Sequence, residues 1–296
     1  MSLVSNHESR GLVHQITHQG RQVCWHEFAS AQSNGPHLVL LHGGHGNWQH
    51  WARNIEALAT RFTVWVPDMP GYGDSDTPPE PTMASLVNLL QATLDQLLGA
   101  ATPIRLAGFS FGGLVAATLA AQRPHIERLA LLGPGGHGGP RRPAGELVSW
   151  RAAKESGDAE ALAQVMRHNL GLHMLHAPGS IDAEAVRIHT AACLNTRFYS
   201  KGISHAGGLA AALAHYNGPL LLAWGEHDVT AVPELVTRTL SEGRLACETH
   251  IVPGAGHWVQ FEGAGFVTRL LLQWLDAATA SASFASRYNE SVSGVP

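Results

Sequence analysis

Short, nearly continuous apolar runs alternate with stretches of helical spacing in the first half of the chain. The runs are rich in Val, Leu and Ile and cover residues 37–43, 62–69, 104–110 and 128–135. Such runs are typical of parallel strands that are buried on both faces. The stretches between them place apolar residues three and four positions apart, over residues 48–60, 84–99 and 112–124. The pattern therefore predicts a parallel sheet with helices between its strands.

The pattern changes on either side of this region. Residues 11–28 alternate apolar and polar positions around a tight turn, which predicts a β-hairpin. From about residue 144 to 215 the spacing is helical, with no strand run. Strand runs return at residues 219–225 and 249–254, and an amphipathic helix over 266–278 closes the fold.

Helices inserted into a parallel sheet predict a core that carries a cap. The core is expected in two parts, and the expected boundaries are an N-terminal tail (1–10), the core (11–138 and 216–280), a helical cap (139–215) and a mobile C-terminal tail (281–296).

Composition and charge narrow the classes of protein that the chain can belong to. Its 296 residues are 45% apolar, the formal net charge is -4, and Lys and Arg form no cluster. A large core can therefore be buried, and the positive surface of a nucleic-acid-binding protein is not expected. No apolar run is long enough to span a bilayer, and the N-terminus lacks the pattern of a signal peptide. We expect a cytoplasmic protein that acts on a small molecule, with no nucleic-acid or membrane partner; a homodimer is left open.

The stretch LAGFSFGGL, residues 106–114, is the strongest candidate for chemistry. It contains the pattern G-x-S-x-G between a predicted strand and a predicted helix, the context in which this pattern forms a sharp turn that exposes its serine. Gly108 and Gly112 lack the side chains that would collide where the strand and the helix close on one another. Ser110 is therefore predicted to be a nucleophile.

A serine nucleophile needs a base and a group that orients the base. Asp228 and His257 each follow one of the two late strands, so both are predicted to lie at the same end of the sheet as Ser110. The chain order Ser, Asp, His is that of a nucleophile-elbow hydrolase. Glu226 is the alternative acid, because it stands in the same loop as Asp228.

An oxyanion that forms at Ser110 needs preorganised N–H donors. We predict the backbone N–H groups of Phe111 and Gly44 for this role, with Gly43 as the alternative to Gly44. These glycines belong to the loop LLHGGHGNW, residues 40–48.

Metal binding is not expected from the spacing of the candidate ligands. His42, His45 and His50 fit no strong metal motif, and His42 is expected to form hydrogen bonds beneath its loop. The acidic stretch DMPGYGDSD, residues 68–76, fits neither a phosphate loop nor an EF-hand, so its expected role is architectural. The cysteines are far apart and predict neither a disulfide framework nor a zinc knuckle; they are Cys24, Cys193 and Cys247.

Taken together, five motifs resemble the α/β-hydrolase superfamily over about residues 11–279: HGG (42–44), DMPGYGDSD (68–76), GFSFGG (108–113), WGEHD (224–228) and GHW (256–258). The resemblance implies the α/β-hydrolase fold, a mostly parallel eight-stranded sheet flanked by helices with an inserted helical cap. It also implies serine-dependent hydrolysis of a small apolar ester, thioester or vinylogous diketone, with no cofactor. The dehalogenase and epoxide hydrolase branches carry aspartate where this chain has Ser110.

HGGHGNW and GHWVQFE are similar to the meta-cleavage product hydrolases, which split a carbon–carbon bond. That branch tends to carry Asn where this chain has Phe109, and it has a cap arginine for the substrate carboxylate, for which Arg187 and Arg197 are the candidates. Phe109, Trp258, Arg187 and Arg197 are therefore the predicted pocket residues. The cap offers further apolar candidates: Leu170, Met174, Leu175, Phe198 and Tyr199. An apolar substrate is expected.

Two other functions use the same residues. A cofactor-free perhydrolase or haloperoxidase-like enzyme shares the triad, and a substrate panel separates it from a hydrolase. A ligand-binding receptor with slow turnover would keep the scaffold, and burst kinetics without a steady state would favour it.

Overall fold

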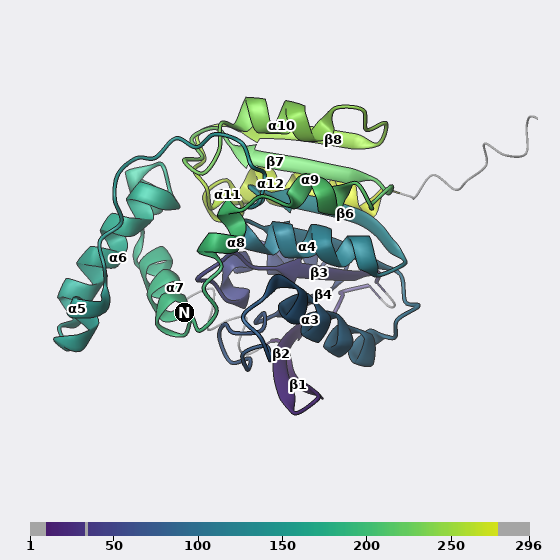
Figure 1. Ribbon diagram of the computed structural model, residues 1–296, viewed down its shortest axis with the longest axis horizontal. Coiled ribbons are helices and arrows are strands. Elements are labelled where there is room, and N and C mark those ends of the chain that lie inside the picture. The colour runs from purple at the N-terminus through teal and green to yellow at the C-terminus, as the bar shows by residue number, and fades with distance from the viewer. Residues whose placement is uncertain (1–9, 33–34, 278–296) are drawn as a thin grey trace, which may run out of the picture.

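The centre of the structure is an eight-stranded sheet (Figure 1). The computed structural model describes residues 10–32 and 35–277, so nearly all of the predicted N-terminal tail and all of the predicted C-terminal tail lie outside the described residues. The strands are β1 (Leu12–His18), β2 (Arg21–Phe28), β3 (His37–Leu41), β4 (Thr63–Pro67), β5 (Ile104–Phe109), β6 (Ile126–Leu132), β7 (Leu220–Gly225) and β8 (Cys247–Val252).

The strand order across the sheet is β1-β2-β4-β3-β5-β6-β7-β8. β2 pairs antiparallel with both β1 and β4, and the other neighbours pair in parallel. β1 and β2 form the predicted hairpin, whose turn residues Gln19 and Gly20 both have positive φ. The prediction of a mostly parallel eight-stranded sheet is confirmed.

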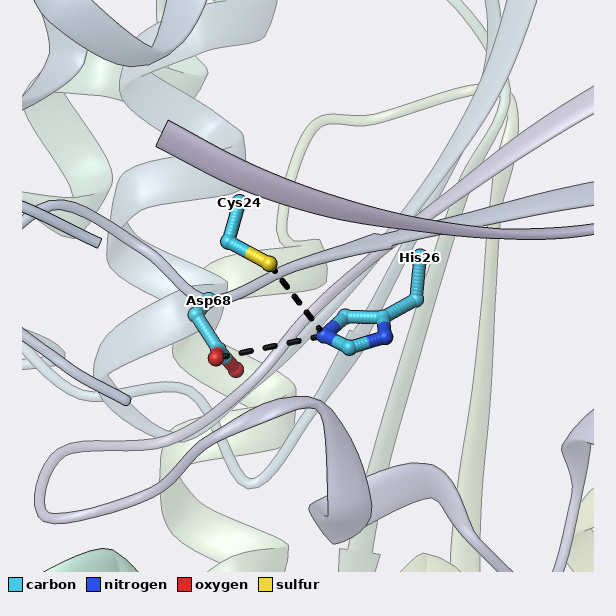
Figure 2. A group of neighbouring side chains, drawn as sticks. All are labelled: Cys24, His26 and Asp68. Carbon is cyan, nitrogen blue, oxygen red and sulfur yellow. Dashed lines mark hydrogen bonds and ion pairs between the residues drawn. The ribbon is translucent and has the colours of Figure 1, made fainter. Parts of the chain in front are cut away.

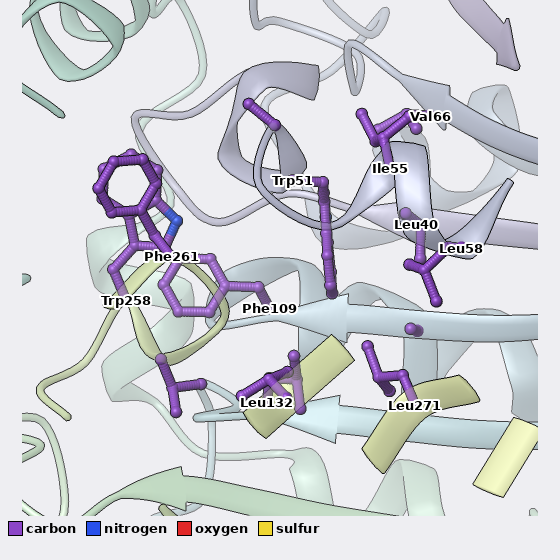
Figure 3. Packing of buried hydrophobic residues seen from close by; sticks show 14 of the residues in the cluster. Leu40, Trp51, Ile55, Leu58, Val66, Phe109, Leu132, Trp258, Phe261 and Leu271 are labelled. Atoms are coloured by element: carbon purple, nitrogen blue, oxygen red, sulfur yellow. The ribbon is translucent and has the colours of Figure 1, made fainter. Parts of the chain in front are cut away.

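Apolar side chains cover both faces of the sheet, which explains why the strands read as continuous apolar runs. Leu38 and Leu40 of β3 pack in one core cluster, and Val39 and Leu41 pack in the other. Figure 3 shows the first cluster, in which Leu40 lies beside Leu58 and between Ile55 and Leu271. This face is covered by α2 (Ile55–Leu58), α11 (Val259–Glu262) and α12 (Ala264–Asp276). The opposite face is covered by α3 (Met83–Leu98), α4 (Phe111–Gln122), α9 (Leu209–Leu213) and α10 (Pro233–Ser241).

The prediction of one continuous helix over residues 48–60 is wrong. The structure has a 3-10 helix, η1 (Trp48–Trp51), followed by the single turn of α2. Between them, the buried Asn54 donates hydrogen bonds from Nδ2 to the Gln260 carbonyl (3.0 Å) and to Thr268 Oγ1 (2.8 Å). Helical spacing alone does not show that a polar side chain inside the segment is tied to a distant helix.

The segment between β6 and β7 is helical, and its two parts lie in different places. It contains α5 (Arg151–Glu155), α6 (Ala159–His173), η2 (Pro178–Ser180), α7 (Ala183–Leu194), α8 (Lys201–His205) and α9. In Figure 1, α5, α6 and α7 stand beyond one end of the sheet, whereas α8 and α9 lie beside α4. Met166 and Leu170 of α6 and Ile188 of α7 join the first core cluster, so these helices are packed onto the core. Within residues 10–32 and 35–277, no helix combines the length and apolar character that crossing a membrane would require.

Replacing Leu40 by alanine should lower the free energy of unfolding by about 3 kcal/mol, because it leaves a cavity between two packed layers. Leu40 is fully buried, whereas the matched control Leu245→Ala removes a side chain that is fully exposed. Urea unfolding of the two variants measures the difference, and similar losses in both would contradict the core described above.

Candidate active site

Ser110 occupies a strained turn between β5 and α4. Its φ is 53°, in the left-handed region that residues other than glycine rarely adopt. The neighbouring chain holds this conformation: the Ser110 N–H donates to the Leu132 carbonyl (2.9 Å), and the Ser110 carbonyl accepts from Gly113 (2.9 Å) and Gly135 (2.8 Å). The turn is therefore fixed from both sides by backbone hydrogen bonds.

Two glycines allow this turn to form. A Cβ on Gly108 would lie 2.3 Å from the Gly112 carbonyl oxygen, and one on Gly112 would lie 2.3 Å from the His42 carbonyl oxygen. Both distances are shorter than any real contact of a Cβ. The strand, the helix and the loop after β3 can approach one another only because these positions are bare.

Ser110, His257 and Asp228 form a continuous chain of hydrogen bonds. His257 Nε2 lies 2.8 Å from Ser110 Oγ, and His257 Nδ1 lies 2.8 Å from Asp228 Oδ2. Asp228 follows β7 and His257 follows β8, so neighbouring parallel strands deliver the two side chains to the same end of the sheet. Asp228 is completely buried, and His257 is 4% exposed. The structure thus brings together the three residues that the sequence singled out.

The carboxyl group of Asp228 is held in its charged form. Burial alone would raise its pKa, but the His257 imidazole and the hydrogen bonds from His257 and Thr230 outweigh burial and lower it. Glu226, the alternative acid, lies on the surface and accepts a hydrogen bond from the Gly254 N–H (2.9 Å). Of the two acids, it is Asp228 that bonds the imidazole.

The loop after β3 lies against the turn at Ser110. A Cβ on Gly44 would lie 3.7 Å from the Cβ of Phe111, and one on Gly43 would lie 3.2 Å from the Cβ of Ser110. The N–H of Gly43 donates to His50 Nδ1 at 3.2 Å. Gly43 is therefore already engaged within its own loop, which leaves Gly44 as the better candidate donor to a ligand.

His42 fastens this loop to its neighbour. Its Nδ1–H donates to the Gly43 carbonyl (2.8 Å), and its Nε2 accepts from the Met69 N–H (2.9 Å). Burial lowers the pKa of His42 to about 4, so the ring is neutral and can both donate and accept. This is the structural hydrogen bonding expected from the sequence.

A second group of titratable side chains, Cys24, His26 and Asp68, lies next to the segment after β3. Figure 2 shows Cys24 and Asp68 both facing one nitrogen of His26: Cys24 Sγ is 3.7 Å and Asp68 Oδ2 is 3.9 Å from His26 Nε2. All three side chains are buried, and their donor atoms lie within 4.8 Å of one another. Burial, reinforced by Asp68 and Asp74, raises the pKa of the Cys24 thiol to about 12, so the thiol stays neutral.

Asp68 uses its charge to shape two loops. Oδ1 accepts the N–H of Trp48 (2.9 Å) and Oδ2 accepts the N–H of Asp74 (3.0 Å). A Cβ on Gly73 would lie 2.1 Å from Oδ2, so residues 68–76 can wrap around the carboxylate only with glycine there. These contacts explain the acidic stretch as architecture.

Phe109 and Trp258 pack against the side chains and loops that form the site. Both are fully buried. The Phe109 ring lies 5.0 Å from the His257 ring, while the Trp258 ring stacks on Phe261 (4.1 Å) and its Nε1–H donates to the His50 carbonyl (3.0 Å). Their contacts make them packing partners of the imidazole and its loop.

The contacts of Arg197 do not support the expected role in binding a substrate carboxylate. Its guanidinium donates to the carbonyl oxygens of Gly73 (2.9 Å), Ser75 (2.5 Å) and Asn195 (3.1 Å). It therefore fastens residues 68–76 to the segment after α7.

Arg187 stands on an outer face of α7. It is exposed and borders a surface depression with Arg167, Thr190 and Leu194. His189, two positions on, lies on a different side of the helix, and burial together with the nearby His45 lowers its pKa. Of the cap candidates, Leu170, Met174, Leu175 and Phe198 are buried, whereas Tyr199 is 64% exposed.

The structure adds two residues that the sequence did not single out. The His173 ring lies 5.7 Å from the His257 ring, and burial together with His257 lowers the pKa of His173 to about 3. Thr230 Oγ1 donates to Asp228 Oδ1 at 2.7 Å. Nothing in a chain with nineteen histidines marks His173, but Thr230 stands in the same loop as Asp228.

Comparison with known proteins agrees with this geometry. The family model described as alpha/beta hydrolase fold matches residues 36–264, and the chain belongs to this family of hydrolases. A pimeloyl-(acyl-carrier protein) methyl ester esterase from Chromobacterium violaceum is 30% identical over 247 residues, which cover 80% of this chain and 82% of that protein.

Two further similarities widen the comparison. A 2-hydroxy-6-oxononadienedioate/2-hydroxy-6-oxononatrienedioate hydrolase from Cupriavidus pinatubonensis is 27% identical over 267 residues, 80% of this chain and 86% of that protein. The crystal structure of naproxen esterase from Bacillus subtilis superposes with a TM-score of 0.73 at 20% identity, covering 93% of this chain and 96% of that one. The latter likeness concerns the fold.

Replacing Gly108 by alanine should lower the free energy of unfolding by about 1–3 kcal/mol, because the new methyl group collides with the backbone of α4. The control Gly202→Ala adds a methyl group in a helix where nothing lies within 4 Å. Thermal unfolding compares the two, and a Gly108→Ala variant as stable as the control would argue against the close approach of β5 and α4.

Three histidines with lowered pKa values should make the protein less stable in mild acid. Burial lowers the pKa of His42 and of His189 to about 4 and that of His173 to about 3, whereas the unfolded chain takes up these protons near the ordinary value of 6.5. The unfolded state therefore binds more protons between pH 6.5 and 4, and each histidine should cost about 1 kcal/mol of stability per pH unit near pH 5. Urea unfolding at pH 7, 6 and 5 measures the slope. His189→Gln should make it shallower by about that amount, and an unchanged slope would show that His189 is not held neutral.

Proposed function

We propose that the protein is a serine hydrolase in which Ser110 is the nucleophile, His257 the general base and Asp228 the residue that orients the base. The observation that carries this proposal is the pair of 2.8 Å hydrogen bonds that join the three side chains. The strained φ of Ser110 supports it, because strained backbone conformations are concentrated at active sites, where the surrounding structure holds them in place.

The reaction begins when His257 Nε2 takes the proton of Ser110 Oγ as this oxygen attacks the substrate carbonyl carbon. The negative charge that develops on the carbonyl oxygen is stabilised by the backbone N–H groups of Phe111 and Gly44. His257 then gives its proton to the leaving group, and an acyl group remains on Ser110.

A water molecule completes the cycle. His257 takes a proton from the water as its oxygen attacks the acyl carbon, and the proton passes to Ser110 Oγ when the ester bond breaks. Asp228 stays ionised throughout and stabilises the imidazolium that forms in both halves.

The substrate that we favour is a small apolar ester, with a thioester or a vinylogous diketone as the alternatives. The names of the relatives support this range, since one is a methyl ester esterase and another is a hydrolase of an oxo-dienedioate. Met174 accepts the Trp258 N–H through its carbonyl (2.7 Å), so the C-terminal end of α6, with the buried Leu170 and Met174 beside His173, lies next to His257. Because Arg197 is engaged by backbone carbonyls and Arg187 stands on the outer face of α7, an ester without a carboxylate is favoured over a carboxylated diketone.

Ser110→Ala should reduce the turnover of p-nitrophenyl butyrate by roughly 10⁴- to 10⁶-fold, because the remaining groups cannot form an acyl-enzyme. Initial rates give the loss, and circular dichroism tests whether the fold is kept. The control Ser156→Ala changes an exposed serine at the end of α5 and should leave the rate unchanged. Undiminished turnover in a folded Ser110→Ala protein would overturn the proposed function.

A further inference from the structure

Thr230 is attached to the Asp228–His257 pair by three contacts. Its backbone N–H and its Oγ1–H both donate to Asp228 Oδ1, each at 2.7 Å. Its Oγ1 also lies 3.1 Å from His257 Nδ1. The other carboxylate oxygen, Oδ2, faces His257, so Thr230 and His257 hold the two oxygens of one carboxylate.

The count of protons fixes the direction of each hydrogen bond. A threonine hydroxyl has one proton, and an ionised carboxylate can only accept, so the Thr230 proton points to Asp228 Oδ1. Oγ1 then presents a lone pair to His257 Nδ1, and this nitrogen must carry the imidazole proton. Nε2 is left without a proton and can accept the hydroxyl proton of Ser110, which is the state that a general base needs.

The position of Thr230 is itself fixed from the other side. The Gly139 N–H donates to His137 Nδ1 (2.9 Å), so the proton of His137 is on Nε2, from which it is donated to the Thr230 carbonyl (2.9 Å). Thr230 is 8% exposed. The segment after β6 thus anchors the backbone of Thr230, while its side chain reaches the triad.

From these contacts we infer that Thr230 is a positioning residue that fixes the rotation of the Asp228 carboxylate and the tautomer of His257. The inference rests on the proposed function, since it assigns Thr230 a part only if His257 acts as the base. Thr230 touches no substrate and acts through the two side chains that it orients.

The variant Thr230→Val tests the inference, because it keeps the shape of the side chain and the backbone bond to Asp228 but removes the hydroxyl. We expect kcat to fall by about 10- to 100-fold with KM unchanged, as for the loss of a hydrogen bond to a charged group. Thr230→Ser keeps the hydroxyl and should restore most of kcat.

The pH profile supplies a readout that a merely structural role would not move. Thr230→Val removes a donor from Asp228 (2.7 Å) and an acceptor from the Nδ1–H of His257 (3.1 Å). The shorter bond, made to a charged oxygen, dominates, so Asp228 attracts the proton on His257 more strongly and the acid limb of kcat/KM should move to higher pH by up to about one unit. The other titratable groups that face the pair are His50, His137, His173 and Arg141, and the variant leaves them unchanged.

The matched control is Thr237→Val on α10. Thr237 is 7% exposed, and its hydroxyl has no hydrogen-bond partner within the described part of the chain, so the control measures the general effect of the same substitution in a buried place. It should change neither kcat nor the pH profile. Equal kinetics for Thr230→Val, Thr237→Val and the unchanged protein would overturn the inference, as would a loss of activity in Thr230→Val that serine does not rescue.

A measurement on the resting protein separates this inference from the proposed function. The proton on His257 Nδ1 should give a low-field NMR signal that is lost in His257→Gln and shifted in Thr230→Val but not in Thr237→Val. If the signal shifts while Ser110→Ala remains active, the positioning is real and the proposed function fails. If Ser110→Ala is inactive while the signal stays in place in Thr230→Val, the function stands and the inference fails.

Discussion

Asp68 and Asp228 carry negative charge in places that water hardly reaches, with 2% and 0% of their surfaces exposed. A buried carboxylate is costly unless protein groups surround it with donors, and here backbone N–H groups and the side chains of His257 and Thr230 are among them. Asp68 takes N–H groups from Trp48 and Asp74, and Asp228 takes one from Thr230. The loops at this end of the sheet are therefore shaped around two anions.

This constraint connects the sheet to the chemistry. β4 ends immediately before Asp68 and β7 ends three residues before Asp228, and the apolar layers on both faces of the sheet fix where those strands end. The loop after β3 is then held by His42, His50 and Asp68, and it meets the turn at Ser110 through the bare Cα positions of Gly43 and Gly112. The core thus fixes the strand ends, and the loops that extend from those ends hold one another and the turn at Ser110 in place.

The sequence predicted the parts of this arrangement that depend on local pattern and chain order. Continuous apolar runs mark β3 to β7 because both faces of these strands are covered, and the order of Ser110, Asp228 and His257 follows from the order of the strands that carry them. It did not predict contacts between distant polar groups. Asn54, which bonds to Gln260 and Thr268, stands where the expected helix is interrupted, and the bonds of Arg197 to residues 73 and 75 occupy a side chain expected at the substrate. Such contacts depend on the tertiary fold and have no local signature.

The bond between Gly43 and His50 has a consequence for how the site responds to acid. Histidines usually make a site sensitive to small changes of pH, because their charge changes near neutrality. Burial and the surrounding histidines keep the pKa of His50 well below the ordinary value, and its Nδ1 remains an acceptor as long as the ring is neutral. The neutral ring therefore continues to accept the Gly43 N–H, and this hydrogen bond holds the loop across the pH range in which free histidines titrate.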